Sequence, residues 1–259
     1  MDLHELLQQA RSVRGIPFSD LALPFSSLGD LLAEQTRRTP EKTWLIFYDE
    51  NGSRSELSYA AFTKLVRRTA GFLLESGIGK GDRVATIANN HSDTVIQYFA
   101  TWWIGATVVP VNVGEDDERI AYILENSQAK LAFVRGEYLE RIAGIAARTG
   151  LAMQMTFCIG NSDEQNSFSA ILAADEYDAP TPATDLMNHE CLIVYTSGTT
   201  GNPKGVLLAH GNLLADAAGI TAWHGITADA RMMCVLPIHH VNGTVVTLVS
   251  PMFAGSSVV

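Results

Sequence analysis

Hydrophobic and polar residues follow two periods along this chain, one typical of amphipathic helices and one typical of buried strands. The helical period predicts helices that start near residues 28 and 58, and further helices at 93–104, 117–126, 138–148 and 211–224. Short apolar runs predict strands at 44–48, 81–88, 106–112, 130–134, 153–159, 191–195 and 232–236. Because helices and strands alternate from residue 59 onward, the sequence predicts an α/β fold with mainly parallel sheets and helices on both faces.

Capping and turn residues mark the ends of the first elements. Ser27 and Ser58 are of the type that accepts hydrogen bonds at helix starts, and Asp30 follows Ser27 in a capping-box-like order. Asn51-Gly52 separates two strand-like runs and is a strong hairpin signal. The sequence therefore predicts a helix, a hairpin and a second helix before the regular alternation begins.

The run from Thr196 to Val206, TSGTTGNPKGV, concentrates glycines, hydroxyl side chains and one lysine in a short segment. Glycines let backbone N–H groups turn toward an anion, hydroxyls add donors, and a lysine adds positive charge. The apolar run CLIVY precedes it, so the segment is predicted at a strand's carboxyl end, where ligands collect in open α/β sheets. The predicted phosphate-binding residues are Thr196, Ser197, Gly198, Thr199, Thr200, Gly201 and Lys204.

Two other glycine-containing motifs do not match this run. A Walker loop needs a glycine where Pro203 stands and a serine or threonine where Gly205 stands. A nucleophile elbow around Ser197 needs a glycine where Tyr195 stands. A plain surface turn uses the same residue types, but the order and density of the run favour phosphate binding.

Composition and charge exclude several classes of protein. With 259 residues, 47% hydrophobic and 18% charged, the chain should be ordered and have a large core. A net charge of −10 argues against binding to nucleic acid or to an anionic membrane. Three widely separated cysteines form neither a disulfide framework nor a zinc motif, which favours a reducing compartment.

The sequence shows neither a secretory signal nor a membrane span. Its first 15 residues carry acids and glutamines without an apolar centre. The apolar stretch 99–113 is interrupted by Gly105, Pro110 and Asn112 and is shorter than the about 20 residues that a membrane helix needs. We expect a cytoplasmic protein without a transmembrane segment.

The motifs together resemble those of the adenylate-forming, AMP-binding superfamily, above all its acyl-CoA synthetases and fatty-acid–CoA ligases. The resemblance is carried by the run at 196–206, by LSYAAF at 57–62, by the turn and strand at 77–84, and by the apolar passage at 102–112. It implies part of a large N-terminal domain with two stacked α/β subdomains. The implied boundaries are residues 1–58, packing with the second subdomain, 59–215 as the first subdomain, and 216–259 as the start of the second, with an incomplete second sheet.

The resemblance also implies a reaction. ATP and Mg²⁺ would activate a small-molecule carboxylic acid to an acyl-adenylate, and coenzyme A would then take the acyl group as a thioester. One alternative is an adenylation enzyme that loads a carrier-protein phosphopantetheine; another is a non-catalytic nucleotide-binding module. A comparison of coenzyme A with a holo carrier protein as the acceptor separates the two enzymes.

A second candidate segment is LPIHHVNG at 236–243, whose two histidines follow a strand-like run. Adjacent strand side chains point in opposite directions and seldom chelate one metal ion, so local hydrogen bonding is the alternative to a site. The resemblance places His240, with Asn242 and Gly243, on the wall between nucleotide and acyl carboxylate. Where many peptide-synthetase domains use an aspartate to pair with an ammonium group, this chain has His240, which favours an acid without an α-ammonium.

The chain ends in GSSVV, a β-branched sequence typical of a strand. We expect it to be the first part of a longer enzyme, because the family's adenylation lysine and its Mg²⁺ carboxylate belong to segments beyond Val259. In that case Lys204 contributes charge to phosphate binding only. These 259 residues alone are then expected neither to adenylate acids nor to bind ATP tightly.

Overall fold

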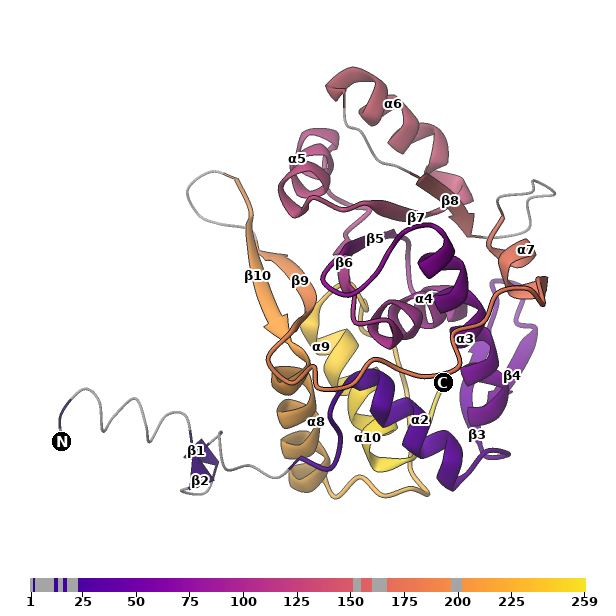
Figure 1. Cartoon of the computed structure of the whole chain (residues 1–259), viewed down its shortest axis with the longest axis vertical. Helices are drawn as coiled ribbons and strands as arrows, with labels where there is room; N and C mark the ends of the chain where they lie inside the picture. Colours follow the sequence, from indigo (N-terminus) through magenta and orange to yellow (C-terminus); the bar gives the residue numbers. More distant parts are fainter. Residues whose placement is uncertain are drawn as a thin grey trace.

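The computed structural model describes residues 2, 12–13, 16–17, 23–150, 155–159, 167–196 and 202–259 (Figure 1). The helices and helical turns are α2 (Leu28–Arg38), α3 (Tyr59–Glu75), α4 (Ser92–Trp103), α5 (Asp117–Ser127), η2 (Gly136–Tyr138), α6 (Leu139–Thr149), α7 (Phe168–Ala173), α8 (His210–His224), α9 (Val241–Thr244), η3 (Val245–Val249) and α10 (Ser250–Ala254). The strands are β1 (Ser12–Val13), β2 (Ile16–Pro17), β3 (Thr43–Tyr48), β4 (Arg54–Ser58), β5 (Arg83–Ile87), β6 (Thr107–Val111), β7 (Leu131–Arg135), β8 (Met155–Ile159), β9 (Glu190–Thr196), β10 (Lys204–Ala209), β11 (Arg231–Met232) and β12 (Ser257–Val258).

The larger sheet has six strands in the order β10-β9-β6-β5-β7-β8. The neighbours from β9 to β8 pair in parallel, whereas β10 pairs with β9 as an antiparallel edge strand. Alternate residues of one strand enter different cores: Val84 joins the core that contains α2, α3 and α4, and Ala85 joins the core of α5 and α6. The predicted α/β fold with helices on both faces is therefore confirmed (Figure 1).

A second sheet combines distant parts of the sequence, in the order β11-β12-β3-β4. The hairpin of β3 and β4 is antiparallel, as Asn51-Gly52 predicts, and Gly52 has the positive φ of 79° that such a turn requires. Strand β12 pairs in parallel with β3, and β11 pairs in parallel with β12. Residues of both sheets and of α2, α3 and α4 belong to one continuous core.

The predicted strand at 232–236 is wrong in its extent. Strand β11 covers only Arg231–Met232, and the chain beyond it leaves the sheet after Cys234 N–H donates to Val259 O at 2.7 Å. Met233 is 66% exposed and Val235 is 71% exposed. The apolar run indicated burial, but it lies at the edge of the sheet, so it lacks a neighbouring strand on its outer side.

The two predicted helix caps are confirmed. Ser27 Oγ accepts from Asp30 N–H at 3.0 Å, and Ser58 Oγ accepts from Ala61 N–H at 3.2 Å. The carboxylate of Asp30 does not complete a standard capping box, because it accepts from Ser26 N–H at 2.8 Å. Both caps satisfy N–H groups that the first helical turn leaves without a partner.

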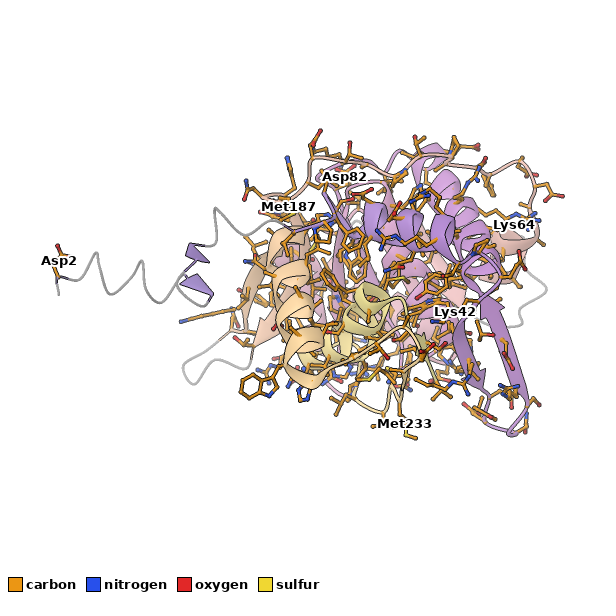
Figure 2. All side chains as sticks on the ribbon, turned by 90° about the horizontal axis from the view of Figure 1, so that it is seen from below. Asp2, Lys42, Lys64, Asp82, Met187 and Met233 are labelled. Atoms are coloured by element: carbon orange, nitrogen blue, oxygen red, sulfur yellow. The ribbon has the colours of Figure 1, made fainter. Side chains whose placement is uncertain are left out.

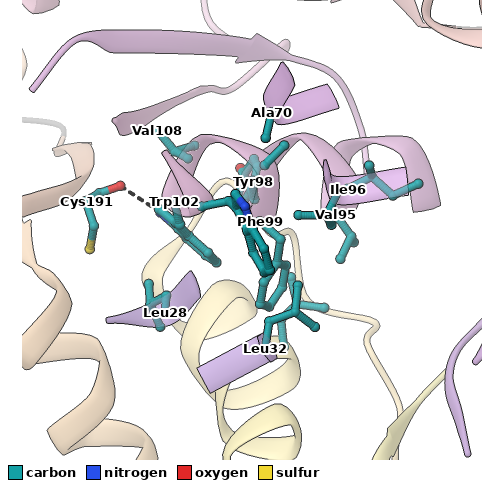
Figure 3. Close-up of a cluster of buried hydrophobic side chains, with 14 of the residues drawn as sticks. Leu28, Leu32, Ala70, Val95, Ile96, Tyr98, Phe99, Trp102, Val108 and Cys191 are labelled. Carbon is teal, nitrogen blue, oxygen red and sulfur yellow. Dashed lines mark hydrogen bonds between the residues drawn. The ribbon is translucent and has the colours of Figure 1, made fainter. Parts of the chain in front are cut away.

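Aromatic side chains fill the core beneath the larger sheet. Trp102 of α4 is fully buried, and its ring centroid lies 5.1 Å from that of Phe99. Its indole Nε1–H donates to Cys191 O of β9 at 2.8 Å, which the dashed line in Figure 3 marks. This contact fixes α4 against the strand that leads to Thr196.

None of the helices in the described part of the chain is long and apolar enough to cross a membrane. The predicted cytoplasmic location stays a prediction.

A buried histidine joins the starts of two helices. His210 is the first residue of α8, and its side chain is 0% exposed. Its Nδ1 accepts from Leu28 N–H, the first amide of α2, at 3.1 Å. Burial, together with the nearby His189, lowers the pKa of His210 to about 3, so the ring is neutral at pH 7.

We expect this histidine to make the fold sensitive to acid. Its pKa is about 3 in the folded chain and about 6.5 in an unfolded one, so only the unfolded chain takes up this proton between those values. Stability therefore falls as the pH falls through this window. From pH 7 to pH 5 this group alone should lower the free energy of unfolding by about 2 kcal/mol.

Urea unfolding at the two pH values checks this expectation in wild type and in His210→Asn. The asparagine oxygen can still accept from Leu28 N–H but does not titrate. The variant should lose that part of the pH dependence, and an unchanged pH dependence would contradict the assignment.

Candidate functional site

The predicted phosphate-binding run begins at the last residue of β9 and ends within β10. Strand β9 ends at Thr196, which confirms the predicted strand before the run, and β10 begins at Lys204, directly opposite Thr196 in the antiparallel register. The hydroxyl of Thr196 donates to Lys204 O at 3.4 Å, and the Lys204 side chain is exposed. Ser197, Gly198, Thr199, Thr200 and Gly201 lie outside the described residues.

The two histidines lie on a tight turn that leads into α9. His240 N–H donates to Pro237 O at 3.1 Å, and His240 O accepts from Thr244 N–H at 3.0 Å. The two imidazole centroids are 4.3 Å apart. Partial burial, and then the neighbouring His240, lower the pKa of His239 to about 4, so that ring is neutral at pH 7.

Gly243 allows this turn to close. A Cβ atom at this position would lie 2.2 Å from Pro237 O and 2.6 Å from Pro237 C. Both atoms are backbone and cannot move aside as a flexible side chain could. A glycine is therefore needed for α9 to pack beneath the turn that carries His239 and His240.

The two predicted segments meet at one cavity of about 580 Å³. Its lining includes Thr196 from the end of β9 together with His240, Asn242 and Gly243. The remaining lining residues are mostly apolar: Val194, Val206, Leu208, Leu236, Pro237 and Val241. The lining thus combines the polar side chains of Thr196, His240 and Asn242 with apolar side chains from β9 and β10.

A smaller recess opens beside this cavity and shares Thr196 and His240 with it. It adds His239 and three polar residues outside the two predicted segments: Asn112, Glu115 and Arg119. Arg119 Nη1 lies 3.2 Å from Glu115 Oε2.

The signal for Asn112 was present in the sequence, because it directly follows β6. The carboxyl ends of the neighbouring parallel strands β6 and β9 share one edge of the sheet. Nothing comparable marks Arg119, which reaches the recess from α5.

Of the predicted site residues, the structure therefore brings together Thr196, His240, Asn242 and Gly243. Lys204 lies at the start of the adjacent strand and lines neither recess. In the described part of the chain no three His, Cys, Asp or Glu side chains gather to hold a metal ion. The arrangement combines hydroxyl, amide and imidazole groups and the Arg119–Glu115 ion pair with apolar residues, which suits a ligand that has both a polar and an apolar part.

Comparison with known proteins identifies the family. The model of the AMP-binding enzyme family matches residues 32–259, and the chain belongs to that family. Sulfoacetate–CoA ligase of Cupriavidus necator is 29% identical over 91% of this chain and 45% of its own length. The human mitochondrial malonate–CoA ligase ACSF3 is 29% identical over 96% of this chain and 40% of its own length.

The fold agrees with this membership. The crystal structure of ATP-bound MatB from Rhodopseudomonas palustris superimposes with a TM-score of 0.74 at 26% identity. The match covers 89% of this chain and 44% of that protein. The chain thus spans less than half the length of each of these three relatives.

Proposed function

We propose that the protein containing these 259 residues activates a carboxylic acid with ATP to an acyl-adenylate and then transfers the acyl group to coenzyme A. The observation that carries the proposal is the meeting of Thr196 with His240 at one cavity, in a chain of the AMP-binding enzyme family. The names of the relatives support the reaction class, because both curated relatives are CoA ligases. The ATP-bound state of MatB supports the nucleotide.

The first step requires stabilisation of negative charge. A carboxylate must attack the α-phosphorus of ATP, and charge accumulates on the phosphates as pyrophosphate leaves. We assign the β- and γ-phosphates to the run that begins at Thr196 and ends at Lys204. Mg²⁺ enters as part of the ATP substrate, because this ion binds mainly to substrate phosphates with few protein carboxylates.

The second part of the proposal concerns the acid. Among the residues that the structure describes, the lining of the larger cavity contains no aspartate or glutamate that could pair with an ammonium group. We propose that His240 and Asn242, which line this cavity, face the carboxylate end of the acid, and that the apolar residues of β9 and β10 contact the rest of it. We therefore propose a carboxylic acid without an α-ammonium group.

Pyrophosphate exchange into ATP tests the reaction. The assay would use the protein that contains these residues, with acetate, malonate, sulfoacetate, longer fatty acids and aryl acids as substrates, and with amino acids as controls. At least one acid should support exchange, and amino acids should not. If the folded protein showed no exchange with any acid, the adenylation step would be overturned. If a thioester formed only with a holo carrier protein, coenzyme A would be overturned as the acceptor.

Lys204 gives a graded prediction within this proposal. We expect Lys204→Ala to lower kcat/KM for ATP roughly 5- to 150-fold, because one charge-assisted contact to phosphate is lost. This factor corresponds to about 1–3 kcal/mol of transition-state stabilisation. Lys64→Ala is the matched control, since Lys64 is an exposed lysine of α3 (Figure 2). Complete loss of adenylation in folded Lys204→Ala would show that this lysine does more than supply charge.

A further inference from the structure

A side chain from a distant loop holds the backbone directly before the two histidines. Asn90 Oδ1 accepts from Ile238 N–H at 2.9 Å, and Asn90 Nδ2 donates to Leu236 O at 2.8 Å. One carboxamide thus pairs with a donor and an acceptor two residues apart, as the edge of a neighbouring strand would do. Asn90 thus provides hydrogen-bond partners for Leu236 and Ile238, which follow β11 and lie outside the sheet.

The same backbone is held from its other side. Ile238 O accepts from the buried Tyr98 hydroxyl at 3.2 Å and from the Thr244 hydroxyl at 2.6 Å. The Ile238 side chain is 2% exposed and belongs to the large core. Ile238 is therefore a fixed point, and the next residue along the chain is His239.

Asn90 lies in a short loop whose next residue is anchored by two contacts. It lies between the end of β5 and the start of α4, at the carboxyl edge of the sheet that carries Thr196. The next residue, His91, caps α4, because its Nδ1 accepts from Asp93 N–H at 3.1 Å. The His91 ring also packs on Phe47 of β3, with centroids 4.6 Å apart. The hydrogen bonds of Asn90 therefore attach the histidine turn to the edge of the larger sheet.

Asn90 does not belong to the proposed binding site. It lines two other cavities, of about 340 and 470 Å³, and neither of the recesses that contain Thr196 and His240. We therefore expect an effect of Asn90 on the reaction to act through its hydrogen bonds to the backbone of Leu236 and Ile238.

We propose that Asn90 is a positioning residue, which sets the place of the His239–His240 turn at the cavity through its two hydrogen bonds to Leu236 and Ile238. This inference rests on the proposed function. In the proposed function the His239–His240 turn faces the acid, whereas the phosphate-binding run starts at the end of β9. Loss of the Asn90 hydrogen bonds should therefore affect binding of the acid and the chemical step more than binding of ATP.

The test compares Asn90→Ala with Asn89→Ala in the protein that contains this chain. Asn89 is the adjacent exposed asparagine, and its Nδ2 donates to Tyr138 Oη at 2.8 Å, away from the histidine turn. Asn90→Ala should lower kcat/KM for the acid about 10- to 100-fold while the KM for ATP changes less than about threefold. Asn89→Ala should match wild type within about twofold in both constants.

Amide hydrogen exchange reports on the contact without an assay of activity. Exchange at Ile238 and His240 should accelerate about tenfold or more in Asn90→Ala and stay at the wild-type rate in Asn89→Ala. Asn90→Asp keeps the acceptor for Ile238 N–H but loses the donor to Leu236 O, so it should protect the Ile238 amide more than Asn90→Ala does.

The outcomes separate the two proposals. Active wild type with unchanged kinetics in Asn90→Ala would overturn the positioning role and leave the proposed function intact. An equal rise of the KM for ATP and the KM for the acid would also overturn it, because a general loss of structure moves both. Wild type without pyrophosphate exchange would overturn the proposed function, and the positioning role with it.

Discussion

Replacing Trp102 by alanine is expected to lower the free energy of unfolding by about 3–5 kcal/mol, the scale of removing a large aromatic side chain from a core. The indole is 0% exposed and packs edge-on against Phe99 and Tyr98 (Figure 3). Its loss would leave a cavity and would also leave Cys191 O without the indole donor at 2.8 Å. Such a loss is a large fraction of the stability of an ordinary domain.

Urea unfolding measures this effect, and the chain provides a matched control in another tryptophan. Trp223 of α8 is 83% exposed, so Trp223→Ala should change stability by less than about 0.5 kcal/mol. Trp102→Phe keeps much of the apolar contact but no N–H donor and should fall between the two. If Trp102→Ala lost no more than Trp223→Ala, the core position of α4 would be wrong.

The parallel strands and the helix starts could be predicted because their signals are local. Strands β5, β6 and β7 each contribute buried apolar residues to both faces of the sheet, since each face meets a different layer of helices. Ser27 and Ser58 cap their helices through amides only three residues away. Burial and short-range hydrogen bonds of this kind leave a direct trace in the order of residues.

The edges of the sheets left a weaker trace. Strand β10 was not predicted, because its first four residues are exposed and one of them is Gly205. The apolar run at 232–236 gave the opposite error: it predicted a strand, but most of the run lies outside the sheet. An edge strand forms only by pairing with a neighbouring strand, and its own hydrophobic pattern does not indicate which strand that is.

For the candidate site, the sequence indicated the residues but not their arrangement. Thr196 and His240 line one cavity although they come from distant segments, and no local pattern predicts this juxtaposition. The contact between Asn90 and Ile238 joins residues 148 positions apart. The roles of Thr196, Lys204, His240, Asn242 and Gly243 in binding stay predictions, as do the roles of residues 197–201 and the domain boundaries.

Gly243→Ala should displace the histidine turn. The added Cβ would lie 2.2 Å from Pro237 O and 3.0 Å from Ile238 Cα, and a backbone contact of that kind is relieved only if the turn or α9 shifts. Overpacking of a core typically costs 1–3 kcal/mol, and we expect about 3 kcal/mol here because the obstructing atoms are backbone. In the protein that contains this chain, kcat/KM for the acid should fall by about tenfold or more.

Gly219→Ala is the matched control, since Gly219 lies on the exposed side of α8 and a Cβ there meets nothing within 4 Å. Alanine is the better helix former, so this variant should be more stable by about 0.5–1 kcal/mol, with unchanged kinetics. The two glycine variants should therefore shift the urea midpoint in opposite directions. If both shifted it upward, the close contact between Gly243 and Pro237 would not exist in solution. If Gly243→Ala lost stability but kept its kcat/KM for the acid, the turn would be structural and His240 would have no part in acid binding.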